Sequence, residues 1–222
     1  MPRLAASFTL STGAKGLDGL LGGGVPVPCT LELVGPAGSG KTQLCHQLAV
    51  MVQLPPSRGG LAASALYVDT EGTFRPERIV AMAEYRGLDP SEALDRIVYA
   101  RARSWEDVVS AVAAEKEAGL VLVDSLSSPF RGAVTRAEAA ALSGKLSSLA
   151  AFLLRLALKR KVGVVFTSHA VGAGSFGDPY LSLFVCARVY LEPAEGVIVA
   201  RVPGRGQVRL VITEEGVLSA EG

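Results

Sequence analysis

The chain has 222 residues, of which 49% are hydrophobic, and its formal net charge is +1. This length suits one α/β domain with a sizeable core, and the hydrophobic fraction argues against an intrinsically disordered chain. The near-zero charge provides no global basic field, so any DNA contact must come from local patches. No apolar run is long enough to span a membrane, and residues 1–7 are too few for a signal peptide. We therefore expect a cytoplasmic protein without membrane contact.

The first predicted element is a short helix within residues 9–25. Leu17, Leu20 and Leu21 fall on one face of this helix, and the glycines at 22–24 end it. On its own, this segment predicts only a packing turn.

A strand over residues 30–34 is predicted next, followed by a glycine-rich loop and a helix over residues 43–50. The loop reads Gly35-Pro36-Ala37-Gly38-Ser39-Gly40-Lys41-Thr42. A strand, such a loop and a helix in this order form the context of the Walker A phosphate loop. Its glycines let backbone N–H groups turn inward as an anion nest, and the helix N-terminus adds its own N–H groups.

This loop predicts a nucleoside triphosphate site with Mg²⁺. Lys41 would supply a full charge for the outer phosphates and Thr42 a hydroxyl for Mg²⁺. The alternative is a glycine turn that precedes a lysine by chance, which the flanking strand and helix disfavour. The expected nucleotide-binding residues include Gln43 beside the loop itself: Gly35, Pro36, Ala37, Gly38, Ser39, Gly40, Lys41, Thr42 and Gln43.

Two acids follow the next predicted strand, which covers residues 65–69. Ligands gather at the carboxyl ends of strands in open α/β sheets, so we expect Asp69 and Glu71 near the phosphates. A carboxylate there could orient or deprotonate an attacking water. The alternative is a solvated pair of loop acids; the glycine and proline that constrain the loop favour a functional Glu71.

Three further helices are predicted: one over residues 79–85, one that starts at Asp89, and one that runs from a capping box at Ser104 through Glu117. A strand over residues 96–100 is predicted between the second and the third of these helices. Trp105 is expected to anchor the start of its helix rather than to stack on a base. Residues 120–125 are aliphatic until Asp124, which is the Walker B pattern. Its carboxylate would reach the Mg²⁺ shell.

A loop over residues 129–136 carries two arginines and precedes a long helix with one apolar stripe. Leucines at positions 142, 146, 149, 153 and 156 form that stripe, which we predict to be core. A buried strand over residues 163–167 ends at Ser168 and His169. At this strand end His169 would sense the terminal phosphate, or it would merely cap the following loop.

Three short alternating segments close the chain, at residues 188–191, 197–201 and 207–212, and predict an antiparallel extension of the sheet. Arginines 201, 205 and 209 would form a basic strip there. The three cysteines, Cys29, Cys45 and Cys186, form no C-x-x-C pair and lie in apolar surroundings, so we predict buried, reduced thiols. The fold class predicted is α/β: one P-loop domain over residues 1–222, with a mostly parallel central sheet flanked by helices.

Several of these segments resemble the RecA/RadA recombinase family. The segments Leu10 to Gly13, Leu17-Asp18 and Leu20 to Gly24 look like the family's lead-in, and Gly40 to His46 and Gln53 to Pro55 are similar to the archaeal RadA and eukaryotic core. The run Asp69-Thr70-Glu71-Gly72-Thr73-Phe74-Arg75-Pro76-Glu77-Arg78 is the most specific segment. The resemblance covers roughly residues 9–191 and implies a RecA-like fold.

The resemblance also implies roles for individual residues. Glu71 would be the catalytic glutamate and Asp124 the metal-binding acid, while Arg78 would lie on the adenine. Arg131 and Arg136 would belong to a first DNA-binding loop, and residues 170–184 to a second. His169 stands where the family has a glutamine that couples the terminal phosphate to DNA.

Other departures predict an accessory role. No N-terminal helical DNA-binding domain or Phe-x-x-Ala motif precedes Thr9, so the pattern is similar to core-only RadA paralogues such as RadB. We therefore predict a weak, DNA-modulated ATPase of DNA repair and homologous recombination. Its expected partners are ATP, a RadA-type recombinase, DNA (single-stranded and weakly bound) and other copies of itself. Two alternatives stay open: a nucleotide-gated binding module and a KaiC-like regulatory ATPase.

Overall fold

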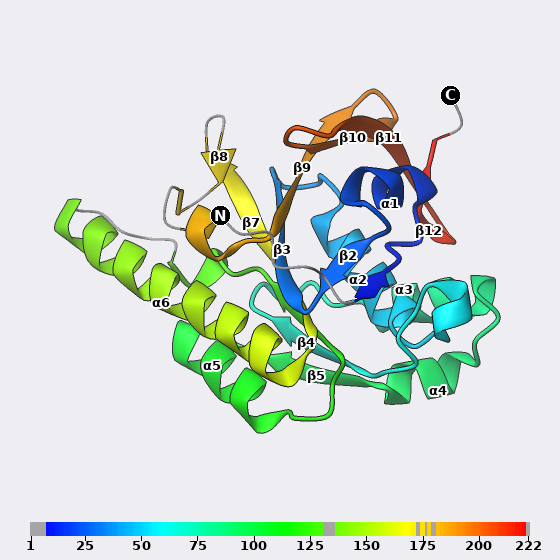
Figure 1. Cartoon of the computed structure of the whole chain (residues 1–222), viewed down its shortest axis with the longest axis horizontal. Helices are drawn as coiled ribbons and strands as arrows, with labels where there is room; N and C mark the ends of the chain where they lie inside the picture. The colour runs from blue at the N-terminus through cyan, green and yellow to red at the C-terminus, as the bar shows by residue number, and fades with distance from the viewer. Residues whose placement is uncertain (1–7, 131–135, 172–173, 176, 179–180, 221–222) are drawn as a thin grey trace.

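One large sheet runs through the molecule, and the computed structural model describes it together with its helices over residues 8–130, 136–171, 174–175, 177–178 and 181–220 (Figure 1). The strands are β1 (Phe8–Leu10), β2 (Val25–Val27), β3 (Cys29–Gly35), β4 (Ala65–Asp69), β5 (Ile97–Arg101), β6 (Leu120–Asp124), β7 (Gly163–Val171), β8 (Gly174–Ser175), β9 (Ala187–Ala194), β10 (Val197–Val202), β11 (Gly206–Thr213) and β12 (Gly216–Ser219). The helices are α1 (Lys15–Leu21), α2 (Lys41–Met51), α3 (Pro76–Tyr85), α4 (Pro90–Asp95), α5 (Trp105–Ala114) and α6 (Arg136–Arg160), with short 3-10 turns η1 (Pro56–Arg58), η2 (Ser128–Phe130) and η3 (Leu181–Phe184).

The strand order in the large sheet is β12-β11-β10-β9-β3-β7-β6-β4-β5. Strands β9, β3, β7, β6, β4 and β5 are mutually parallel, whereas β10, β11 and β12 continue the sheet in antiparallel fashion from β9. This arrangement confirms the predicted mostly parallel sheet with its C-terminal antiparallel extension. It also places β3, which leads into the glycine-rich loop, in the interior of the sheet.

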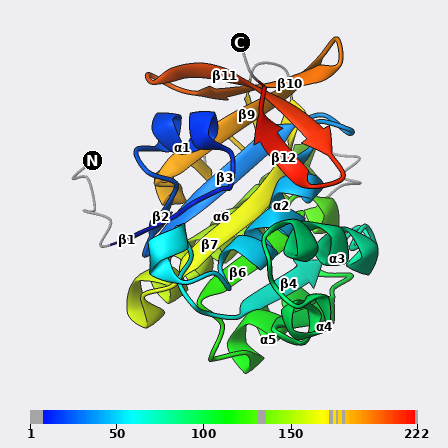
Figure 2. The same ribbon diagram turned by 90° about the vertical axis from the view of Figure 1, so that its right-hand side faces the viewer.

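Helices cover both faces of the parallel strands (Figures 1 and 2). Alternate residues of each strand point to opposite faces, as in β4, where Tyr67 joins the core under α1, α2 and α3 while Leu66 and Val68 join the core under α5 and α6. Continuous apolar strands such as β6 are required because neither face meets water. The leucine stripe of α6 lies in this second core, as predicted.

Some boundaries and strands differ from the predictions. α5 ends at Ala114 rather than Glu117, because the Glu115 carboxylate accepts backbone N–H groups of residues 117 and 118 and turns the chain. Strands β1 and β2 form a small separate sheet, and β12 adds a fourth C-terminal strand, none of which was predicted. These strands are three or four residues long, too short to show an alternating pattern.

The prediction of three buried, reduced thiols is wrong. Cys29 and Cys186 form a disulfide with a Cα–Cα distance of 6.1 Å, and Cys186 is an exposed residue. Only Cys45 is a buried free cysteine among the residues that the structure describes. The disulfide could not be predicted from the sequence because the two cysteines are 157 residues apart. They come together only because β3 pairs with β9 in the sheet. Within the described ranges, no helix is both long enough and apolar enough to cross a bilayer.

Candidate active site

The glycine-rich loop joins the end of β3 to the start of α2. Gly38 and Gly40 have φ angles of 76° and 84°, a region in which a side chain would strain the backbone. A Cβ at Gly35 would approach within 2.5 Å of the Leu191 carbonyl oxygen, and one at Gly40 within 2.6 Å of Ile198 Cδ1. The loop therefore requires glycine both for its conformation and for its close packing against β9 and β10.

Lys41 folds its side chain back into this loop. Its ammonium group donates hydrogen bonds to the carbonyls of Gly35 and Pro36 at 2.9 and 2.7 Å and to Ser39 Oγ at 3.3 Å, and the residue is 7% exposed. A cation held inside a glycine-lined turn beside a helix N-terminus fits the phosphates of a nucleotide. The chain folds locally as the sequence predicts.

Asp124, at the end of β6, lies directly beside the loop. Its Oδ2 accepts hydrogen bonds from Thr42 Oγ1 at 2.7 Å and Tyr67 Oη at 3.1 Å, and its Oδ1 accepts one from Thr167 Oγ1 at 2.6 Å. Burial raises the pKa of Asp124, and these hydrogen bonds oppose the rise.

The donor set fits Mg²⁺. A hydroxyl and one carboxylate supply only two side-chain ligands, and no cluster of three or more acidic, cysteine or histidine ligands occurs in the described part of the chain. Mg²⁺ is typically held in this way, through one or two carboxylates, substrate phosphates and water. Thr42 and Asp124 are the two predicted metal ligands, and the fold places them in contact.

Glu71 lies in the loop after β4 and meets two neighbouring strand ends. Its Oε1 accepts a hydrogen bond from Ser125 Oγ at 2.9 Å and lies 3.2 Å from His169 Nε2. The side chains of Glu71 and His169 are 26% and 22% exposed, so water reaches both. The structure thus brings together Glu71 and His169, two of the predicted catalytic residues. Ser125 was not predicted, although its place directly after Asp124 was a usable signal.

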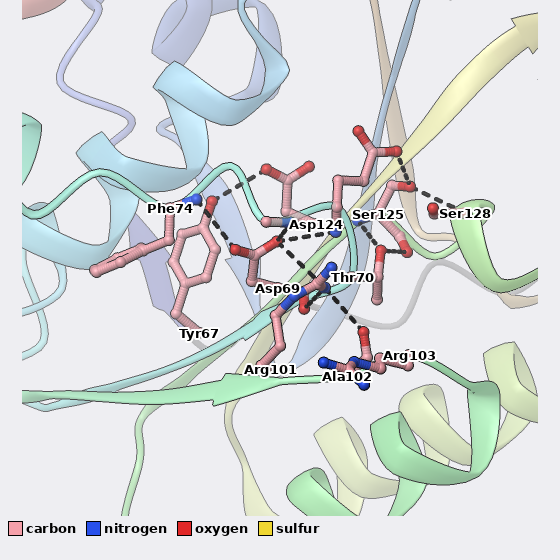
Figure 3. A network of polar contacts seen from close by, with 12 residues as sticks. Tyr67, Asp69, Thr70, Phe74, Arg101, Ala102, Arg103, Asp124, Ser125 and Ser128 are labelled. Carbon is pink, nitrogen blue, oxygen red and sulfur yellow. Dashed lines mark hydrogen bonds and ion pairs between the residues drawn. The ribbon is translucent and has the colours of Figure 1, made fainter.

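Asp69, the other acid expected near the phosphates, is engaged by the backbone of the loop that follows it. Its Oδ1 accepts the backbone N–H groups of Glu71 and Gly72 at 2.9 and 2.7 Å, and its Oδ2 accepts that of Phe74 at 3.1 Å (Figure 3). Asp69 is fully buried; burial alone would raise its pKa, but these backbone hydrogen bonds outweigh it and lower the pKa. Its role is to hold the loop that presents Glu71.

A buried histidine of α2 also contacts the backbone of this loop. His46 of α2 accepts the backbone N–H of Arg75 on Nε2 at 3.1 Å, and its ring lies 5.5 Å from that of Tyr67 and 5.4 Å from that of Phe74. Burial lowers the pKa of His46 to about 4. No sequence pattern indicated this role, because His46 contacts residues that are distant in the chain.

Arg78 and Gln43 also meet, at the N-terminal ends of α3 and α2. Arg78 Nε donates to Gln43 Oε1 at 2.9 Å, and its terminal nitrogens donate to the carbonyls of Thr213 and Glu214 at 2.7 and 3.2 Å. The guanidinium plane is thereby fixed between the phosphate-loop helix and the β11–β12 turn. A planar cation held in this way can stack on a nucleobase.

The predicted DNA contacts cannot be placed. Arg131 lies outside the described residues. Arg136 is the first residue of α6, but the structure does not describe the side chain of Arg136. Of the expected basic strip, Arg201 lies over the Tyr190 ring at 4.7 Å, whereas Arg205 donates to the Leu20 carbonyl at 3.1 Å.

A sequence model of the Rad51 family matches residues 4–209, which include Lys41, Thr42, Glu71, Asp124 and His169. The chain belongs to the Rad51 family. It is also 43% identical, over 184 residues, to a DNA repair and recombination protein RadA of Metallosphaera sedula. That match covers 78% of this chain and 57% of the relative, so the Rad51-family chain matches little more than half the length of that protein. The predicted RecA/RadA relationship is thereby confirmed.

Proposed function

We propose that this Rad51-family chain binds ATP with Mg²⁺ and hydrolyses it slowly in homologous recombination and DNA repair. The observation that carries the proposal is the contact of Thr42 with Asp124 at the mouth of a loop that already holds Lys41. The family assignment and the similarity to a RadA protein support the same activity.

The hypothesised roles follow from the positions of the side chains. Lys41 and the loop N–H groups would bind the phosphates, and Thr42 and Asp124 would hold Mg²⁺, which supplies charge neutralisation on the phosphoryl oxygens. Gln43 and Arg78 would contact the base. Glu71 would orient the attacking water and accept its proton, since it is the accessible carboxylate at this edge of the sheet.

His169 is proposed to control Glu71. In the described state both Ser125 and His169 contact Glu71 Oε1, so the carboxylate oxygen that would bind water is engaged. Turnover would therefore be slow until a ligand draws His169 away. This contact also supports the alternative of a nucleotide-gated module or KaiC-like regulatory ATPase, in which the nucleotide changes the shape of the β7 end without appreciable hydrolysis.

The wider role is proposed from the family. We expect an accessory protein of the cytoplasm, with a RecA-like core domain within residues 1–222, that works with a RadA-type recombinase and binds single-stranded DNA weakly. Arg131 and Arg136 are the proposed DNA contacts, and self-association is proposed. A titration with DNA at several salt concentrations tests this, because phosphate contacts weaken as salt rises.

Single-turnover ATP hydrolysis, with and without single-stranded DNA, tests the enzymatic proposal. Glu71→Gln should lower the rate by about 100-fold, the order expected of general base catalysis, without weakening ATP binding, whereas Lys41→Ala should abolish ATP binding. Glu77→Gln, an exposed acid on α3, is the matched control and should behave as the parent. An unchanged rate in Glu71→Gln would reject Glu71 as the base, and His169→Gln should raise the rate if His169 restrains it.

A further inference from the structure

The two cysteines of the Cys29–Cys186 disulfide differ in their exposure to solvent. Cys29, the first residue of β3, is 2% exposed, whereas Cys186, directly before β9, is an exposed residue. A thiolate arriving from solvent therefore reaches Cys186 first. Accessible disulfides of this kind are the ones that exchange with external thiols.

Cys186 also lines a cavity of about 330 Å³. Its walls are residues 182 and 185–188 on one side and the β10–β11 turn, with Val202, Pro203 and Arg205, on the other. Apolar residues and two arginines thus line the cavity together with Cys186. A cavity of this volume suits a small organic molecule.

The two arginines of the cavity are not equivalent. Arg188 is engaged by carboxylates, since its Nε donates to Glu32 at 2.6 Å and its terminal nitrogens to Asp178 at 2.9 and 3.1 Å. Arg205 donates to the Leu20 carbonyl, and no carboxylate lies within ion-pair distance of it among the described residues. Arg205 is the cation in the cavity that an anionic ligand would meet.

We propose that Cys186 is a modification site at which a small thiol carrying a carboxylate forms a mixed disulfide within this cavity. The thiolate sulfur attacks Cys186 Sγ, a new S–S bond forms there, and the Cys29–Cys186 bond breaks. The bonding electron pair leaves on Cys29 Sγ, which takes up the proton that the small thiol gave up. The exchange consumes one thiol and releases one thiol, so it needs no oxidant. Arg205 binds the carboxylate of the incoming molecule.

Hydrogen bonds hold the segment of Cys186 against the strand of Cys29 after the disulfide is broken. Cys186 N donates to the Thr30 carbonyl at 3.0 Å, and Thr30 Oγ1 donates to the Phe184 carbonyl. The segment before β9 therefore remains paired with β3 after the exchange, and Cys29 stays close to the mixed disulfide. Renewed attack by Cys29 on Cys186 Sγ expels the small thiol, so the modification is reversible.

The test treats the purified, non-reduced chain with glutathione, traps free thiols by alkylation at successive times, and locates the adduct by peptide mass spectrometry. We expect one glutathione on Cys186 and an alkylated Cys29. Cysteamine, a thiol without a carboxylate, should react about fivefold more slowly, the order expected for one exposed ion pair. Arg205→Gln should remove this preference, whereas Arg209→Gln, an exposed arginine that does not line the cavity, should keep it.

Three outcomes would overturn the proposal. They are free Cys29 and Cys186 thiols in the untreated chain, an adduct on Cys29 or Cys45, and complete reduction with no adduct at any time. Equal rates for glutathione and cysteamine in the parent chain would overturn the role of Arg205. Cys186→Ser should yield no adduct; an adduct on that variant would also reject the assignment.

Discussion

Thr42 Oγ1 donates a 2.7 Å hydrogen bond to Asp124 Oδ2, although the two residues are 82 positions apart in the sequence. One residue opens the helix after β3 and the other ends β6, and β7 lies between these two strands in the sheet. A hydroxyl from the helix that follows β3 and a carboxylate from the non-adjacent strand β6 are therefore in contact.

Replacing Thr42 should reveal whether this site binds a cation. Thr42→Val removes the hydroxyl at nearly constant volume and should weaken ATP binding in Mg²⁺ by about tenfold, the loss of one hydrogen-bonding or liganding oxygen. Thr42→Ser keeps the hydroxyl and should bind nearly as the parent does. Calorimetry in Mg²⁺ and in a chelator measures both; an equal loss in the chelator would show that the hydroxyl acts without the metal.

Asp69→Asn tests the support of the Glu71 loop. The substitution replaces a charged acceptor of three backbone N–H groups by a neutral one, and it should lower the free energy of unfolding by about 2 kcal/mol. ATP hydrolysis should slow while ATP affinity stays the same, because the phosphate loop is untouched. Chemical denaturation and single-turnover kinetics measure these effects. Asp95→Asn, an exposed acid at the end of α4, is the control and should change neither quantity.

The contrast between Asp69 and Asp124 shows how far the sequence predicts the site. Both acids end buried strands, and Figure 3 shows them at neighbouring strand ends. The sequence distinguishes Asp124 because its Walker B pattern occurs together with the Walker A loop. The role of Asp69 depends on the path of residues 71–74, whose N–H groups turn back onto it. A strand pattern carries no information on that path.

The fold was predictable for strands that are buried on both faces and for the helix that buries one long apolar stripe. The continuous apolar runs of β3, β4, β6 and β7 and the leucines of α6 indicate their elements directly. The disulfide and the short strands β1, β2 and β12 were missed because their partners are set by tertiary packing. The Gln47 side chain illustrates this, since it donates to the carbonyls of Thr12 and Val217, which lie 35 and 170 residues away in the sequence.

The low pKa of His46 predicts a pH dependence of stability. Its pKa of about 4 in the folded chain lies below the unfolded value near 6.5, so the unfolded chain binds the extra proton between these values. The stabilisation is fully present above pH 6.5 and is lost as the pH falls to 4, by roughly 3 kcal/mol. Because carboxyl groups titrate in the same pH range, the free energy of unfolding is compared between the parent and His46→Gln. The difference in unfolding free energy between the two proteins should shrink over this window; a constant difference would contradict the prediction.

Arg188 is predicted to neutralise a fully buried acid. Burial raises the pKa of Glu32 and alone would lower that of Arg188, but the Glu32 and Asp178 carboxylates raise the pKa of Arg188. Arg188→Met leaves Glu32 without its counter-charge and should cost about 3–5 kcal/mol in urea denaturation. Adding Glu32→Met should recover most of this loss. Arg201→Met, which breaks the exposed 3.8 Å pair with Glu192, should cost less than about 1 kcal/mol.

The position of β3 in the sheet has a consequence for synthesis on the ribosome. Its two neighbours are β7, which begins at Gly163, and β9, which begins at Ala187. The phosphate loop is thus translated long before either neighbour, and the strand that leads into it has no pairing partner until β7 has emerged. Pairing between such distant segments is slow, and unpaired apolar strands are prone to aggregate. A nascent chain arrested before residue 163 should therefore bind no nucleotide and should need chaperones to stay dispersed.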